Sequence, residues 1–192
     1  MSKEPLLVIL DLDETLIHAT KVAAHDIYDF EIGPYKVIKR PGLDHFLNTI
    51  AMHFKVAVWS SASDDYVKEV VKQIFPESYP LVFAWGRSRC TLKPVAEAGD
   101  GLDYYNAYDH LSYVKPLKKV VKSGFGQIER ILIVDDTPSK SRSNYGNAIY
   151  PKVFTGEPDD EELMHLQTYL LTFKDVSNVR TIEKRGWNLS NS

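Results

Sequence analysis

The sequence predicts an α/β fold in which helices cover both faces of a doubly wound parallel sheet. The first observation is a set of three apolar runs without polar alternation, at residues 6–10, 55–59 and 131–134. Such runs are typical of strands that are buried on both faces. The second observation is that segments with helical periodicity lie between the runs. This strand–helix alternation is characteristic of a parallel α/β domain.

Three segments show the helical pattern. Residues 43–54 place their apolar side chains on one helical face. Residues 64–75 begin with two acidic residues, which the helix dipole favours in a first turn, and Ser63 can cap that turn. Residues 157–173 repeat the arrangement, with acidic residues first and an apolar face after them. We expect the apolar run at residues 81–84 to form a further strand.

Two segments interrupt the alternation of strands and helices. Residues 21–40 contain Gly33-Pro34 between extended-looking runs, which predicts a small β-hairpin insertion. Residues 86–114 are polar, rich in aromatic residues and contain glycine, which predicts a loop-rich excursion. Since no linker or repeat divides the chain, we expect residues 1–192 to form a single domain.

Composition limits the classes of function. The 192 residues carry a net charge of -3 and have a pI near 6.1, so no global basic field attracts nucleic acid. Cys90 is the one cysteine, which excludes an intramolecular disulfide and suits a reducing compartment. No stretch is long and apolar enough to span a membrane, and the N-terminus lacks a secretory signal. We expect a cytoplasmic or nuclear protein.

Polar side chains follow the three apolar runs at the point where each run ends. Asp11 follows the first run, Ser60 the second, and Asp135 and Asp136 the third, while Asp13 stands two residues beyond Asp11. Because the carboxyl ends of parallel strands meet at one edge of a sheet, we expect these side chains to surround one crevice.

The clustered carboxylates indicate a metal site. They repel one another and stay ionised only with a cation among them. An all-oxygen set suits Mg²⁺, whereas the six histidines show no spacing typical of zinc ligands. The alternative is structural, with Asp11 as a loop residue and Asp13 as a helix cap, which is common for an isolated pair of aspartates. Polar groups at three strand ends favour the magnesium site.

A metal and an aspartate nucleophile make a coherent mechanism. Asp11 is held next to the strand and can attack phosphorus to form an aspartyl-phosphate. Asp13 can protonate the leaving oxygen and then deprotonate the attacking water, and its backbone carbonyl can face the metal. Mg²⁺ and a lysine would neutralise the phosphate oxygens. The hydroxyl of Thr15 would hold the turn between the strand and the next segment.

Two further assignments have alternatives: which lysine neutralises the phosphate, and whether Ser60 binds the phosphate. Lys115 precedes Pro116 just before a helical segment and the third apolar run, and Lys93 is its competitor because it also precedes a proline. Ser60 can donate a hydrogen bond to a phosphate oxygen, and it can equally cap a helix.

These motifs resemble those of a known superfamily. DLDETLIH at residues 11–18, Ser60, Lys115 and VDDTP at residues 134–138 match in order the four motifs of the haloacid dehalogenase superfamily. The chain is most similar to the branch of small C-terminal-domain (CTD) phosphatases and NLI-interacting-factor-like phosphatases, over roughly residues 6–180. That closer resemblance rests on the octet and on three further segments, KRPG at 39–42, YVK at 113–115 and FTGEPDDEEL at 154–163.

The resemblance implies a Mg²⁺-dependent phosphatase that forms an aspartyl-phosphate. It implies that Asp11 is the nucleophile and Asp13 the general acid and base, and that Ser60 and Lys115 bind the phosphate. Asp136 resembles the direct Mg²⁺ ligand, with Asp135 supporting it, although the residues alone leave the order of these two open. Arg87 resembles an arginine that contacts the substrate, and it can equally be a surface residue.

The resemblance and an open site favour a phosphorylated protein segment, with phosphoserine or phosphothreonine, as the substrate of a monomeric enzyme. Two groups of side chains could line a peptide groove, and each could equally pack against the body of the protein: Phe30, Ile32, Tyr35 and Val37 on the hairpin, and Tyr104, Tyr105, Tyr108 and Tyr113 in the excursion. The alternatives are a small phosphate ester or a nucleic-acid phosphate end, and a pseudophosphatase that only binds. Retention of both Asp11 and Asp13 argues against pure binding.

Overall fold

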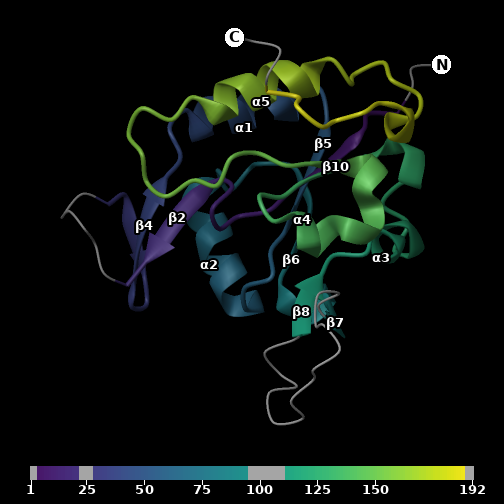
Figure 1. Cartoon of the computed structure of the whole chain (residues 1–192). Helices are drawn as coiled ribbons and strands as arrows, with labels where there is room; N and C mark the ends of the chain where they lie inside the picture. The colour runs from purple at the N-terminus through teal and green to yellow at the C-terminus, as the bar shows by residue number, and fades with distance from the viewer. Residues whose placement is uncertain (1–3, 22–27, 95–110, 189–192) are drawn as a thin grey trace.

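A five-stranded parallel sheet forms the centre of the protein, with the strand order β10–β9–β1–β5–β6. The computed structural model in Figure 1 describes residues 4–21, 28–94 and 111–188. The strands are β1 (Leu7–Leu10), β5 (Lys55–Trp59), β6 (Leu81–Trp85), β9 (Ile131–Val134) and β10 (Ala148–Ile149). The predicted α/β class and its four strands are confirmed. The two-residue strand β10 is too short to produce a sequence pattern of its own.

Each face of the sheet has its own hydrophobic core, because alternate side chains of a strand point to opposite faces. Val8 and Leu10 of β1 belong to a cluster with α1 (Leu43–Ala51), α2 (Asp64–Ile74) and α5 (Glu162–Leu171). Leu7 and Ile9 belong to a second cluster, which includes Val120 of α3 (Lys118–Lys122). In Figure 1, α1 and α5 lie together at the top and α3 lies apart from them on the right.

The three predicted helices correspond to α1, α2 and α5. Ser63 takes the N-cap position of α2 with an extended backbone, but its side chain makes no capping hydrogen bond to any described residue, so that part of the prediction is wrong. The shorter elements are α4 (Pro138–Ser141) and the 3-10 helices η1 (Arg87–Arg89), η3 (Ile128–Arg130), η4 (Arg142–Asn147) and η5 (Val179–Thr181). Within the described ranges, no helix is long and apolar enough to cross a membrane.

The predicted hairpin insertion is part of a three-stranded antiparallel sheet. Its order is β2–β4–β3, formed by β2 (Ile17–Thr20), β3 (Phe30–Ile32) and β4 (Tyr35–Lys39). Gly33 takes a φ of 54° in the turn between β3 and β4, a conformation that favours glycine. The apolar side chains of this hairpin pack on the core, with Val37 fully buried: Phe30, Ile32, Tyr35 and Val37. The packing interpretation of these four residues therefore holds.

The ends of the excursion at residues 86–114 form a β-ribbon rather than a loop. Strand β7 (Thr91–Pro94) pairs antiparallel with β8 (Leu111–Val114), and Thr91 lies opposite Val114. Each strand is only four residues long, so neither produces a clear pattern. Residues 95–110, with Tyr104, Tyr105 and Tyr108, lie outside the described ranges, whereas Tyr113 on β8 is partly exposed.

A buried ion pair joins the segment after β4 to the segment before α5. Arg40 donates from Nε and Nη2 to the two carboxylate oxygens of Asp160, at 2.7 and 2.8 Å. The Arg40 side chain is 0% exposed and that of Asp160 is 4% exposed. Arg40 Nη1 also donates to the Thr15 carbonyl at 3.0 Å. The pair therefore fixes the backbone next to the aspartates that follow β1.

Candidate active site

The sheet brings the residues after three of its strands to one edge. Leu10 lies opposite Val134 in the β1–β9 pairing, and the ladder continues for one more bond, from Asp11 N to Val134 O at 2.9 Å. Ser60 N likewise bonds to Trp85 O at 2.9 Å beyond the end of β5. The parallel register therefore places Asp11, Ser60 and the pair Asp135-Asp136 at the carboxyl edge, as the sequence predicts.

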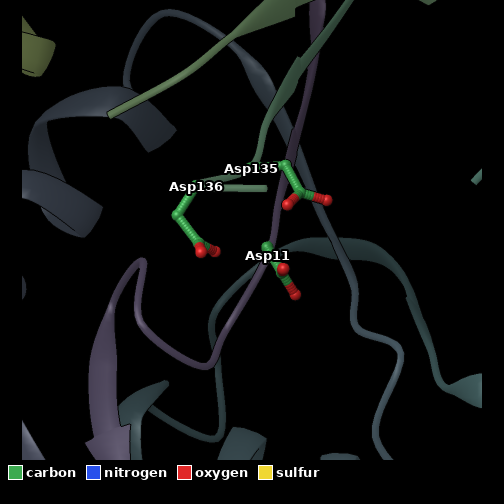
Figure 2. Close-up of side chains that lie close together, drawn as sticks. All are labelled: Asp11, Asp135 and Asp136. Atoms are coloured by element: carbon green, nitrogen blue, oxygen red, sulfur yellow. The ribbon is translucent and has the colours of Figure 1, made fainter. Parts of the chain in front are cut away.

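Three carboxylates at this edge are close enough to share a cation. One oxygen from each of Asp11, Asp135 and Asp136 can be chosen so that all three lie within 4.8 Å of one another. Figure 2 shows these side chains close together, Asp11 on the segment after β1 and Asp135 and Asp136 on the segment after β9. Asp11 is 1% exposed and Asp135 is 0% exposed. Because the donor set consists of carboxylate oxygens in a partly buried cluster, it fits Mg²⁺.

Lys115 points into the same cluster. Its Nζ lies 3.0 Å from Asp11 Oδ2 and 2.7 Å from Asp135 Oδ2, and the side chain is 0% exposed. Burial acts to lower the pKa of Lys115, but the charges of Asp11 and Asp135 outweigh it, so the pKa is raised and the ammonium form is stabilised. Lys93, the competing lysine, is exposed on β7.

A second lysine reaches the cluster, and the sequence analysis missed it. Lys140 Nζ lies 3.1 Å from Asp11 Oδ2 and 3.9 Å from Asp135 Oδ1. The side chain comes from α4, the short helix that begins at Pro138 after the acidic loop, and it is 21% exposed. The available signal was its place as the first lysine after the VDDTP motif.

The two lysines control the charge of Asp11. Burial acts to raise the pKa of the Asp11 carboxyl, but the ammonium groups of Lys115 and Lys140 outweigh it and hold the pKa below its ordinary value. Asp11 Oδ1 also accepts a hydrogen bond from Leu12 N at 2.8 Å. Asp11 is therefore an ionised carboxylate in a nearly water-free position, which is the form that a nucleophile needs.

The pKa of the Asp13 carboxyl is shifted in the opposite direction, above its ordinary value. Burial raises the pKa of its carboxyl and the charge of Asp11 raises it further, although a hydrogen bond from Tyr66 opposes the change. Tyr66 Oη donates to Asp13 Oδ1 at 2.7 Å, and Ser60 Oγ donates to Oδ2 at 3.3 Å. Two neighbouring carboxyl groups with pKa values shifted in opposite directions are suited to the roles of nucleophile and general acid.

Tyr66 was missed because it lies on α2 and reads as part of a helical face. Ser60 does not cap α2, since Ser63 occupies the N-cap position. Its hydroxyl instead accepts a hydrogen bond from Ala62 N at 3.0 Å and faces Asp13. The structure therefore brings Ser60 into the cluster, and its phosphate-binding role stays a prediction.

Hydrogen bonds distinguish Asp135 from Asp136. Asp135 is fully buried, and its oxygens accept from Lys115 Nζ at 2.7 Å and from Thr137 N at 2.9 Å. Asp136 is only half-buried, and it accepts from the hydroxyls of Thr15 at 3.1 Å and Thr137 at 2.9 Å. Thr15 Oγ1 also accepts from Asp136 N at 3.2 Å, so Thr15 ties the β1 turn to the acidic loop.

Arg87 makes no ion pair with the carboxylates of the cluster within the described part of the chain. Its Nε donates to the carbonyl of Ser61 at 2.8 Å, and its guanidinium carbon lies 5.1 Å from the centre of the Tyr113 ring. The residue is exposed at the start of η1. Both interpretations of Arg87, as a substrate contact and as a surface residue, stay open.

Comparison with known proteins places the chain in a family. The model of the NLI interacting factor-like phosphatase family matches residues 6–180. Nuclear envelope morphology protein 1 of Saccharomyces cerevisiae is 26% identical over 190 residues, which cover 91% of this chain and 40% of the yeast protein. CTD nuclear envelope phosphatase 1B of Danio rerio is 25% identical over 199 residues, which cover 94% of this chain and 71% of the zebrafish protein.

A solved structure with the same fold supports this placement. It is the fission yeast RNA polymerase II CTD phosphatase Fcp1 bound to beryllium fluoride, with a TM-score of 0.55 and 18% identity, covering 91% of this chain and 52% of that one. The resemblance noted from the motifs is thus confirmed. The chain has the fold of the haloacid dehalogenase superfamily and belongs to the NLI interacting factor-like phosphatase family, within the CTD-phosphatase-like branch.

Proposed function

We propose that this chain is a Mg²⁺-dependent phosphatase that hydrolyses phosphoric monoesters through an aspartyl-phosphate on Asp11. The observation that carries the proposal is the environment of the Asp11 carboxylate. It is 1% exposed, and its Oδ2 oxygen lies 3.0 Å from Lys115 Nζ and 3.1 Å from Lys140 Nζ. A purely structural aspartate would need one such partner, whereas a carboxylate that must approach a phosphate anion needs more than one cation beside it.

Two aspartates share the chemistry. A carboxylate oxygen of Asp11 forms a bond to phosphorus, the bond from phosphorus to the ester oxygen breaks, and Asp13 gives its proton to the departing oxygen. Asp13 then takes a proton from water, whose oxygen bonds to phosphorus as the bond to Asp11 breaks and phosphate leaves. The raised pKa of Asp13 supports its first role, because a general acid must hold a proton before the reaction begins.

Asp11 and Asp136 would hold the metal, together with the backbone carbonyl of Asp13. When bound, Mg²⁺ supplies positive charge that stabilises the transferring phosphoryl group. Asp136 is the better direct ligand because it is half-buried and, among the described residues, its oxygens accept hydrogen bonds only from hydroxyl groups. Asp135 acts as a supporting residue, since an ammonium and a backbone N–H already occupy its oxygens.

We infer further that the substrate is a phosphorylated protein segment. Ser60 and Lys115 bind its phosphate, and Arg87 contacts the residues around it. The likeness to an RNA polymerase II CTD phosphatase supports a protein substrate, as does the exposed edge formed by Arg87 and Tyr113. A small phosphate ester or a nucleic-acid end is the second candidate, because one fold serves many substrates.

The first test measures hydrolysis of an aryl phosphate with Mg²⁺ and with EDTA, and looks for acid-trapped phosphoenzyme. We expect turnover only with Mg²⁺. Asp13→Asn should lose most turnover and accumulate label on Asp11, because the amide cannot activate water. An active protein that never carries label, or that works equally in EDTA, would contradict the mechanism. Absence of turnover on any ester, with phosphopeptide binding retained, would instead favour the pseudophosphatase.

The second test compares catalytic efficiency on phosphoserine peptides with that on sugar phosphates, nucleotides and 5′-phosphorylated oligonucleotides. We expect peptides to be preferred. A hundredfold preference for a small ester, about 2.7 kcal/mol of transition-state free energy, would refute the protein substrate while leaving the chemistry of Asp11 intact.

A further inference from the structure

Lys140 and Lys115 differ in how many carboxylate oxygens their ammonium groups contact. Lys115 Nζ lies within 3.0 Å of two carboxylates and is 0% exposed, so it is locked in place. Lys140 Nζ has one carboxylate oxygen at 3.1 Å, the next at 3.9 Å, and is 21% exposed. An ammonium has three donors. Among the described residues, Lys140 therefore has hydrogen-bonding capacity left over, at the open side of the cluster.

The fold holds the two lysines in register. Lys115 N donates to Lys140 O at 2.7 Å, and Asn144 Nδ2 donates to Lys115 O at 2.7 Å. Lys140 N is bonded in turn to Thr137 O at 3.1 Å, within the turn that follows Asp136. Because both backbones are tied together, both side chains reach the same oxygen, Asp11 Oδ2, from neighbouring starting points.

We propose that Lys140 is a second phosphate-binding catalytic residue, which moves from Asp11 to a phosphoryl oxygen as the phosphate enters. This inference rests on the proposed function of Asp11. Attack of the Asp11 carboxylate on phosphorus moves negative charge from Asp11 to the phosphoryl oxygens, and the Lys140 ammonium, 3.1 Å from Asp11 Oδ2, is the partly exposed cation beside that carboxylate. Lys115 keeps its contacts with Asp135 and Asp11 and offers its remaining donor to the phosphate. Lys140 instead leaves Asp11 and moves with the phosphate, so it is the second cation that binds the phosphoryl group.

The competing explanation is that Lys140 takes the place of the metal. Its Nζ lies near oxygens of both Asp11 and Asp135, two of the three carboxylates that could share a cation. The two explanations differ in what removal of the ammonium would do. Loss of a phosphate ligand weakens phosphate binding and leaves Mg²⁺ binding unchanged, whereas loss of a competing cation tightens Mg²⁺ binding.

The test is calorimetric binding of inorganic phosphate to the Mg²⁺-loaded chain, which requires no turnover. We compare the wild type with Lys140→Met, Lys140→Arg and the control Lys122→Met, which alters an exposed lysine of α3. Lys140→Met should weaken phosphate binding by about tenfold to a hundredfold, the usual effect of one charged hydrogen bond. Lys140→Arg, which keeps the charge, should bind phosphate more tightly than Lys140→Met. Lys122→Met should match the wild type.

Kinetics on an aryl phosphate give the second measurement. Lys140→Met should lower kcat/KM by about a hundredfold, with an unchanged Mg²⁺ half-saturation concentration. Unchanged phosphate affinity in Lys140→Met, tighter Mg²⁺ binding in that variant, or no phosphate binding to the wild type would each overturn the inference. If the wild type binds phosphate but hydrolyses no ester, the proposed function fails, and the calorimetric comparison still decides the role of Lys140. Should Lys140→Met misfold, Lys140→Gln replaces it.

Discussion

Two groups of buried charged side chains lie on either side of Thr15, and they differ in how their charges balance. Arg40 and Asp160 form a one-to-one pair with two hydrogen bonds at 2.7 and 2.8 Å. At the strand ends, two lysines contact the carboxylates of Asp11 and Asp135, and Asp136 is close enough to share a cation with both. The charges of the first group cancel, whereas the second group has more carboxylates than ammonium groups and so carries an excess of negative charge.

The difference separates a structural site from a chemical one. A balanced, bidentate pair needs nothing further, and its loss costs folding free energy because one charge is left buried alone. An unbalanced cluster is destabilising until a cation balances its charge, and it shifts the pKa values of its members. Burial and the charge of Asp11 raise the pKa of Asp135, for example, despite its bond to Lys115. The two groups are linked, since Arg40 binds the carbonyl of Thr15 and Thr15 binds Asp136.

The largest expected effect is the loss of activity in Asp11→Asn. We expect kcat/KM on an aryl phosphate to fall by roughly 10⁴-fold or more, because the amide cannot accept the phosphoryl group. The variant should stay folded by circular dichroism, since Asn keeps the shape of Asp and can still accept from Leu12 N. Asp175→Asn, at an exposed position, is the control. Turnover near the wild-type value would disprove Asp11 as the nucleophile.

The next largest effect is the loss of folding stability when the Arg40–Asp160 pair is broken. Arg40→Met should lower the free energy of unfolding by about 3–5 kcal/mol, because the buried Asp160 carboxylate keeps its hydrogen bond from Glu162 N but loses its opposite charge. The matched control is the neighbouring Lys39→Met, whose exposed bridge to Asp44, at 3.5 Å, should be worth less than about 1 kcal/mol. Urea titrations measure both. Equal losses in the two variants would show that burial of the pair is not what stabilises it.

The third prediction concerns Mg²⁺ and the unbalanced cluster. Saturating Mg²⁺ should stabilise the wild type by about 2.7 kcal/mol at a hundredfold excess over its Kd, because the ion binds only the folded chain. Asp136→Asn should lose most of this gain, and Asp160→Asn should keep it. Thermal unfolding with Mg²⁺ and with EDTA measures the effect. If Mg²⁺ stabilised Asp136→Asn as much as the wild type, Asp136 would not be a ligand of the ion.

The contrast between the two groups also explains what the sequence could predict. Strands β1, β5 and β9 are uninterrupted apolar runs with acids or a hydroxyl after them, and parallel topology alone requires those groups to meet at one edge. Lys140 and Tyr66 carry no such mark, because a lysine or tyrosine on a helix looks the same whether it faces solvent or a carboxylate. Their roles depend on how α4 and α2 are oriented by tertiary packing.

The same reasoning covers the errors in the fold. Strands β2, β7 and β8 are four residues each, and their pairing depends on neighbours distant in sequence rather than on local propensity. The side chain of Ser63 was expected to cap α2, yet only its backbone takes the N-cap role. The sequence could predict where a longer helix or a buried strand lies along the chain, whereas it could not predict which partner a side chain binds.

The smallest expected effect is the acid dependence of the Arg40–Asp160 pair. Burial acts to raise the pKa of Asp160, but the hydrogen bonds and charge of Arg40 outweigh it, so the folded-state pKa lies below the ordinary value of about 3.9. A group whose folded pKa is lowered stabilises the protein above its unfolded pKa and loses that contribution as pH falls through its folded pKa. The free-energy gap between the wild type and Asp160→Asn should therefore be constant above about pH 5 and narrow below about pH 3.9. Urea titrations across this range measure the gap, with Asp44→Asn as the exposed control. A gap that widens as the pH falls would mean that Asp160 is protonated more readily in the folded chain, and that the pair is not the self-sufficient group described above.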